Sequence, residues 1–180
     1  MPDRAERVAG KGATGQAAGT RTGFGSDRHP FGPGDGLWLG GVEIPGAPRL
    51  HGHSDGDAAL HAVASALLGA AALGDLGDLY PADELTPRGA ASSRFVRDVV
   101  ARLADAGWRP AAVDVTIRAG RPRLAGSGPA MRAAIAGLLG IEEVAVSLKL
   151  STGNLSGDAG AGRVIEAEAV ATVAAIGVES

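Results

Sequence analysis

The stretch DAALHAVASALLGAAAL, residues 57–73, decides the fold class, because it predicts a helix between two groups of strand-forming residues. It is rich in Ala and Leu, a glycine follows it directly, and Ser54 and Asp55 precede it as candidate N-terminal caps. Similar patterns predict helices over residues 92–106 and 129–139. The first of these begins with a pair of serines, which we expect to cap the helix.

Segments in which apolar and polar residues alternate predict half-buried strands on the C-terminal side of the first helix. They span residues 113–118, 144–150 and 165–173, and before the helix residues 37–44 predict a β-hairpin arm that is interrupted at Gly40-Gly41. Strands interleaved with helices on one face of a sheet form a two-layer domain. We therefore predict an α+β fold (an α/β two-layer domain) with a mixed four-stranded sheet, helices on one face and a β-hairpin arm.

Length and composition indicate one soluble globular domain. Of the 180 residues, 45% are hydrophobic and 21% are charged, and none is a cysteine. Without cysteine the chain has no disulfide framework, no thiolate zinc site and no thiol nucleophile. Residues 1–19 are rich in Gly, Ala and charge and show no periodicity, so we expect a flexible N-terminal tail followed by a single domain over residues 20–180.

Charge, aromatic content and hydropathy argue against several classes of partner. Two Trp, one Tyr and three Phe are few for stacking nucleic-acid bases, and a net charge of −3 also disfavours a nucleic-acid partner. No apolar run reaches the roughly 18 residues that a membrane span needs. The opening sequence, MPDRAERVAG, has no apolar segment behind its charges, so we expect no signal peptide and a cytoplasmic location.

Histidines and aspartates gather in one part of the chain. The four histidines, which lie within 33 residues, are His29, His51, His53 and His61. In extended chain, Asp27-x-His29 places both side chains on one face, and His61 stands on the predicted helix one turn after Asp57. One Asp and two His give a set of N and O ligands with an open fourth position, which is typical of catalytic zinc. The spacing of His51-x-His53 also suits a metal, and residues that merely cap turns and helices would cluster in the same way.

A family resemblance is visible at this point. The sequence HSDGDAALHAVASALLGAAALGDLGDLYP, residues 53–81, closely resembles the signature region of the 2-C-methyl-D-erythritol 2,4-cyclodiphosphate synthase family of the non-mevalonate isoprenoid pathway. Three other stretches are similar to the same family, namely SDRHPFGPGDGLWLGGVEIP at 26–45, VDVTIRAGRPRL at 113–124 and VSLKLSTGNLSG at 146–157. Together the resemblance extends over residues 22–176.

The resemblance implies a homotrimer with active sites between neighbouring subunits and one zinc ion per subunit. The implied zinc ligands are Asp27, His29 and His61, and His53 and Thr152 are implied to stabilise the transition state. The resemblance also implies two groups of substrate-binding residues. The group at the polyol and its phosphate contains Ser54, Asp75, Leu76, Gly77, Tyr80 and Asp83. The group at the cytidine diphosphate contains Ala119, Gly120, Arg121, Pro122, Arg123, Leu124, Ala125, Leu150, Ser151 and Asn154.

The implied reaction is an intramolecular phosphoryl transfer by a zinc-dependent phosphorus–oxygen lyase. The 2-phosphate of 4-diphosphocytidyl-2-C-methyl-D-erythritol 2-phosphate attacks the β-phosphorus, CMP leaves, and 2-C-methyl-D-erythritol 2,4-cyclodiphosphate forms. Nucleophile and leaving group are both anionic near neutral pH, so the reaction needs neutralised charge and alignment rather than a strong base. Zinc supplies a Lewis acid, and the Thr152 hydroxyl and the His53 imidazole can donate hydrogen bonds to the developing charge.

Several positions depart from the family pattern. Asn154 stands where the family has a glutamate that binds magnesium, so Mg²⁺ or Mn²⁺ at the substrate diphosphate is expected to bind more weakly. Arg123 replaces a lysine of the cytidine loop. The altered positions of the central cavity between subunits are Ser26, Asp158, Ala161 and Arg163. These departures leave two alternatives, a paralogue that releases CMP by cyclising another CDP-polyol phosphate in another pathway, and a non-catalytic trimer that binds zinc or a nucleotide.

Overall fold

A computed structural model describes residues 19–81 and 87–177 of the chain. The expected N-terminal tail, apart from Gly19, lies outside the described residues. In chain order the strands are β1 (Thr20–Leu39), β2 (Val42–Leu50), β3 (Trp108–Arg118), β4 (Val146–Ser151) and β5 (Val164–Ala175). The helices are α1 (Ala58–Ala71), α2 (Leu76–Leu79), α3 (Ser92–Asp105), α4 (Gly128–Leu139) and α5 (Gly157–Gly160), with 3₁₀ turns η1 (Glu143–Ala145) and η2 (Gly153–Leu155).

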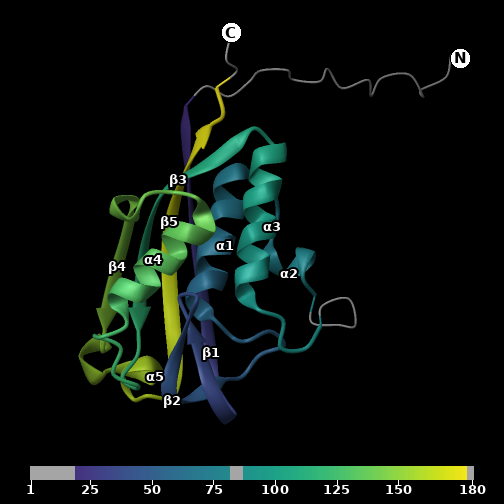
Figure 1. The fold of residues 1–180 in the computed structure, drawn as a ribbon. Coiled ribbons are helices and arrows are strands. Elements are labelled where there is room, and N and C mark those ends of the chain that lie inside the picture. The colour runs from purple at the N-terminus through teal and green to yellow at the C-terminus, as the bar shows by residue number, and fades with distance from the viewer. Residues whose placement is uncertain (1–18, 82–86, 178–180) are drawn as a thin grey trace, which may run out of the picture.

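The five strands form one mixed sheet in the order β2-β1-β5-β3-β4, with only β3 and β4 parallel (Figure 1). The expected α+β class is confirmed, but the sheet has five strands where four were expected. The hairpin turns at Gly40-Gly41, where the predicted arm was interrupted, and its first arm is the end of the long strand β1. Because residues 20–30 of β1 pair with β5 and residues 31–39 pair with β2, the hairpin is continuous with the sheet.

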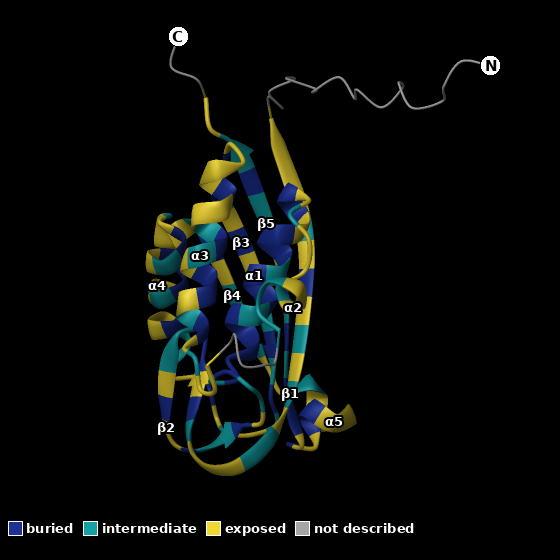
Figure 2. Ribbon diagram, turned by 90° about the vertical axis from the view of Figure 1, so that its right-hand side faces the viewer, coloured by how far each residue is buried: buried dark blue, intermediate teal, exposed yellow. Residues whose placement is uncertain are grey.

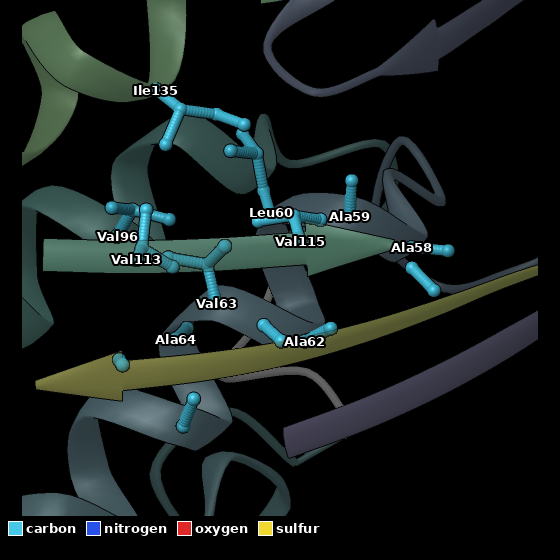
Figure 3. Close-up of a cluster of buried hydrophobic side chains, with 14 of the residues drawn as sticks. Ala58, Ala59, Leu60, Ala62, Val63, Ala64, Val96, Val113, Val115 and Ile135 are labelled. Carbon is cyan, nitrogen blue, oxygen red and sulfur yellow. The ribbon is translucent and has the colours of Figure 1, made fainter. Parts of the chain in front are cut away.

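Helices α1, α3 and α4 cover one face of the sheet, and α1 lies deepest (Figure 2). Eleven of its fourteen residues are buried, so it is apolar on nearly all sides. Figure 3 shows α1 side chains in one cluster with Val96 of α3, Val113 and Val115 of β3 and Ile135 of α4. None of the helices in the described part of the chain is long and apolar enough to span a membrane.

Glycines on β1 allow α1 to lie directly against the strand backbone. A Cβ atom on Gly23 would be 2.2 Å from the carbonyl oxygen of Ala66, and one on Gly25 would be 2.2 Å from that of Ala62. Contacts this short exclude any side chain at either position. The close approach brings the inward-facing residues of β1 within reach of the helix.

Two local expectations are corrected by the structure. Asp57, rather than Ser54 or Asp55, caps α1, because its side chain accepts a hydrogen bond from the backbone N–H of Leu60 at 3.0 Å. The strand predicted over residues 144–150 does not begin at residue 144, since Val144 is 94% exposed within η1 and β4 starts two residues later. The alternation of apolar residues therefore begins before the strand itself.

Candidate functional site

Asp27, His29 and His61 come together at the contact between β1 and α1. Asp27 and His29 are two residues apart on β1 and face the helix, and His61 projects from the first turn of α1 toward them. Their ligand atoms all lie within 4.8 Å of one another. The rival pair His51-x-His53 forms no such cluster within the described residues. Spacing alone left this choice open, and the packing of α1 on β1 decides it.

The separations of the three ligand atoms suit a tetrahedral metal. Asp27 Oδ2 lies 2.8 Å from His29 Nε2 and 2.8 Å from His61 Nδ1, and the two nitrogens are 3.3 Å apart. Ligands about 2.0–2.1 Å from zinc in a tetrahedron are about 3.3 Å from each other, so small outward shifts would admit the ion. One carboxylate and two imidazoles leave the fourth position open for a substrate oxygen.

The cluster also shifts the protonation of two of its members, Asp27 and His29. Burial favours the neutral form of Asp27, but hydrogen bonds from His29 and His61 outweigh burial and hold the pKa of its carboxyl far below the usual range. Burial lowers the pKa of His29, and the hydrogen bond and charge of Asp27 outweigh this effect and raise it. Asp27 is therefore an anion at neutral pH, and a bound metal must displace the proton that Asp27 attracts to His29.

Both histidines are held at the ring nitrogen that points away from the ligand cluster. His29 Nδ1 donates to the backbone carbonyl of His51 at 2.7 Å, which leaves Nε2 for a metal. On His61, Nε2 lies 2.9 Å from Ser92 Oγ and 3.2 Å from Ser54 Oγ, which leaves Nδ1 for a metal. The hydroxyl of Ser92, which is fully buried, donates in turn to the Asp55 carboxylate.

Three residues near His61 have roles that differ from those predicted from the sequence, namely Ser92 and Asp55, which were predicted to cap helices, and Asp57, which was predicted to lie beside His61. Ser92 does not cap α3, because the capping position is Ala91 and no side chain caps the helix there. Asp55 accepts from both the backbone N–H and the hydroxyl of Ser92, so it fixes the start of α3 beside His61. Asp57 points away from His61 and accepts from the backbone N–H groups of Gly40 and Gly41 at 2.8 and 2.7 Å.

Replacing Ser92 by Ala is expected to weaken zinc binding by about tenfold, because His61 loses the acceptor that orients its ring. Zinc affinity can be measured by competition with a chromogenic chelator. Ser93→Ala is the matched control, since the neighbouring hydroxyl accepts a hydrogen bond from the Arg97 guanidinium rather than one from His61. Equal zinc affinity in the two variants would show that Ser92 has no part in orienting His61.

A cavity of about 240 Å³ opens in front of the metal ligands. Five of the predicted polyol-binding or catalytic residues line it, namely His53, Ser54, Leu76, Gly77 and Tyr80. Asp75 does not line it and instead accepts from the backbone N–H of Gly77 at 2.6 Å, while Asp83 lies outside the described residues. We call this space the metal cavity.

Phe95 also lines the metal cavity, and no sequence pattern pointed to it. Its ring stacks on that of Tyr80, with centroids 4.3 Å apart, and lies 6.1 Å from the His61 ring. The Tyr80 hydroxyl donates to Asp98, and burial together with this carboxylate raises the pKa of Tyr80 to about 12. Tyr80 thus stays protonated at neutral pH and its ring forms a fixed wall of the cavity.

A larger cavity, of about 440 Å³, lies where β3 and β4 end. The two strands are parallel, so their C-terminal ends meet at one edge of the sheet, a common place for ligand binding. Eight of its lining residues were predicted to hold the nucleotide, and the ninth, Thr152, was predicted to be catalytic. The eight are Ala119, Gly120, Pro122, Arg123, Leu124, Ala125, Leu150 and Ser151. We call this space the nucleotide cavity.

Two residues predicted to hold the substrate lie beside the nucleotide cavity without lining it. The Arg121 guanidinium packs over the Phe31 ring at 5.2 Å and donates to the carbonyl of Gly162 at 2.8 Å. Asn154 adopts a left-handed backbone, with φ of 52°, in the turn η2 that follows the cavity. Within one chain, Arg121 therefore supports the loop, and its side chain does not reach into the cavity.

The metal cavity and the nucleotide cavity share no lining residue. His53 lines the first and Thr152 the second, so the two predicted catalytic residues belong to different cavities of the chain.

Three of the positions that depart from the family pattern, Ser26, Asp158 and Arg163, are charged or lie beside charged residues. Arg163 Nε donates to Asp158 at 2.9 Å, and Arg28 lies 4.0 Å from Asp158 and 3.7 Å from Glu166. Ser26 pairs with Glu168 across β1 and β5.

Comparisons with known proteins agree with this arrangement. The family model of the YgbB family matches residues 20–174. The 2-C-methyl-D-erythritol 2,4-cyclodiphosphate synthase of Symbiobacterium thermophilum is 47% identical over 152 residues, which cover 84% of this chain and 97% of that protein. The bifunctional enzyme IspD/IspF of Novosphingobium aromaticivorans is 46% identical over 153 residues, but the 85% of this chain that matches spans only 40% of that longer relative.

Solved structures give the same result. IspF from Plasmodium falciparum, in a complex with CDP, superposes with a TM-score of 0.77 at 27% identity and covers 89% of this chain and 99% of its own. The family match, the identity to whole relatives and the shared fold agree over the same residues. The chain therefore belongs to the YgbB family.

Proposed function

We propose that this chain is a 2-C-methyl-D-erythritol 2,4-cyclodiphosphate synthase, which cyclises 4-diphosphocytidyl-2-C-methyl-D-erythritol 2-phosphate and releases CMP. The observation that carries the proposal is the pairing of two cavities, one beside a set of metal ligands and one at the ends of two parallel strands. The relatives with 47% identity bear the name of this enzyme. A CDP-linked substrate has one part for each cavity, a cytidine and a diphosphate.

Zinc is the metal that the proposal assigns to Asp27, His29 and His61, and when bound it supplies a Lewis acid that neutralises phosphate charge. The protein's own groups then have the task of alignment. The nucleotide cavity contains no aromatic residue, so the cytosine is read by backbone groups of the loop after β3. The Thr152 hydroxyl at one end of that cavity donates to the diphosphate as negative charge develops on the leaving CMP.

The proposal includes a homotrimer in which the metal cavity of one copy faces the nucleotide cavity of its neighbour. Two observations support this assembly. The cavities share no residue within one chain, and the outer face of the sheet exposes a cross-strand apolar pair, Phe24 and Val170, at 62% and 43%. An apolar pair at the middle of a bare sheet face is typical of a surface that another copy covers.

The test is CMP release from the methylerythritol substrate by the purified chain, followed by ³¹P NMR of the cyclic diphosphate. We expect zinc-dependent formation of CMP and the cyclic product in equal amounts. A second substrate, a CDP-alditol phosphate of different chain length, separates the paralogue alternative that Asn154 and Arg123 suggest. Turnover of that second compound alone would replace the proposed substrate, and binding of zinc without turnover of either compound would refute an enzymatic role.

A further inference from the structure

A third cavity, of about 330 Å³, borders the metal cavity and shares His53 with it. We call it the basic cavity. Its lining comes from β1, from the end of β2 with the residues that follow it, and from the segment before α3. The lining residues are Gly32, Pro33, Arg49, His51, Gly52, His53, Arg88 and Gly89. The expected zinc and nucleotide residues account for none of these positions except His53, so the function described above leaves this cavity without a role.

The charge of the basic cavity is unusual for this chain. The ionisable residues that line it are two arginines and two histidines, and no carboxylate lines it, although the whole chain has a net charge of −3. Within the described ranges, neither Arg49 nor Arg88 takes part in an ion pair. Two guanidinium groups that face one cavity without a counter-charge favour an anionic ligand.

Backbone hydrogen bonds fix the frame that presents these side chains. The His51 N–H donates to the carbonyl of Pro30 at 2.8 Å, and the Gly89 N–H donates to the carbonyl of His53 at 2.7 Å. The second bond ties the segment with Arg88 to the segment that separates the two cavities. The carbonyl of His51 also accepts from the metal ligand His29, so a hydrogen bond links the frame of the basic cavity to the metal ligands.

We propose that the basic cavity supplies two cationic groups, Arg49 and Arg88, to the phosphate on the polyol arm of the substrate, which Ser54 is expected to hold from the adjoining metal cavity. This inference rests on the proposed function. Two phosphate groups of the same substrate must approach each other in the reaction, and their repulsion opposes this approach unless cations neutralise both. The metal ligands serve the diphosphate, and Arg49 and Arg88 serve the attacking phosphate from the adjoining cavity.

The step that this arrangement assists is balanced without a proton donor or a further reactant. An oxygen of the arm phosphate forms a bond to the β-phosphorus. The bond between the β-phosphorus and the oxygen that bridges to the α-phosphate breaks, and CMP leaves with that electron pair. Because the arginines neutralise charge on the attacking group before the reaction begins, their main effect is on substrate binding.

The experiment compares Arg49→Gln and Arg88→Gln with Arg97→Gln, an exposed residue of α3 that lines none of the three cavities. We expect each of the first two variants to raise KM for the substrate about tenfold while the Kd for CDP stays unchanged, since CDP lacks the arm phosphate. Arg49→Lys should restore part of the lost affinity because it keeps the charge. Inorganic phosphate should compete with the substrate in the wild type and more weakly in both Gln variants.

Three results would overturn the inference. These are an unchanged KM in both Gln variants, an equal loss of CDP and substrate affinity, and phosphate inhibition that the substitutions do not alter. The last would mean that inorganic phosphate acts at another site. Failure of the proposed function is a separate result, because the wild type itself would then release no CMP from the methylerythritol substrate.

Discussion

Asp27→Asn should remove the bound metal and lower CMP release by about 1,000-fold. Asp27 is the only carboxylate in the ligand cluster, and its Oδ2 atom lies 2.8 Å from each histidine nitrogen. An amide in its place provides no anionic ligand, and the loss of Lewis-acid stabilisation is worth about 4 kcal/mol of activation free energy. The metal content of the purified protein, by atomic emission, and the rate of CMP release measure the two effects.

The matched control is Asp105→Asn, at the exposed C-terminal end of α3. It makes the same chemical change and should leave both metal content and rate unchanged. If Asp27→Asn kept one equivalent of zinc and the wild-type rate, Asp27, His29 and His61 would not be the catalytic metal site.

Gly25→Ala should destabilise the fold by about 3 kcal/mol and weaken zinc binding at the same time. The added Cβ would lie 2.2 Å from the Ala62 carbonyl oxygen and 2.6 Å from the Ala66 nitrogen, both of which belong to the α1 backbone. The helix must move away from β1, which is expensive in a closely packed interior. Because Asp27 and His29 are on β1 and His61 is on α1, the same movement separates the metal ligands.

Gly137→Ala is the matched control, because the same substitution should raise the stability of the fold at this position. Gly137 lies in α4, where a Cβ would meet nothing within 4 Å, so Ala should stabilise the helix by about 0.5–1 kcal/mol. Chemical denaturation of both variants, together with zinc titration, measures the two effects. Equal stability of Gly25→Ala and the wild type would show that α1 does not depend on contact with a bare strand backbone.

Sequence patterns predicted the helices well and the longest strand poorly. The predicted range 57–73 for the first helix differs from α1 by two residues or fewer at each end, because its Ala and Leu residues have high helix propensity. By contrast, β1 contains five glycines and two prolines among twenty residues, so no alternation identified it over most of its length. Two of those glycines, Gly23 and Gly25, serve the packing instead, because they make room for the helix.

The candidate site shows the same limit. Spacing placed Asp27 and His29 on one face of an extended segment, but it could not choose between His61 and the pair His51-x-His53. The choice depends on which strand lies against α1, and this is a property of the tertiary packing. Ser92 and Phe95 could not be found from sequence for the same reason, because the position of α3 beside α1 brings them to His61.

The measurement that tests the central claim most directly is complementation between His53→Ala and Thr152→Ala. His53 lines the metal cavity and Thr152 lines the nucleotide cavity, so each variant alone should be inactive if one site uses both. Co-refolded mixtures of the two variants should recover CMP release, because some neighbouring copies then pair an intact metal cavity with an intact nucleotide cavity. Mixtures that contain mixed assemblies but release no more CMP than the separate variants would contradict a site shared between copies.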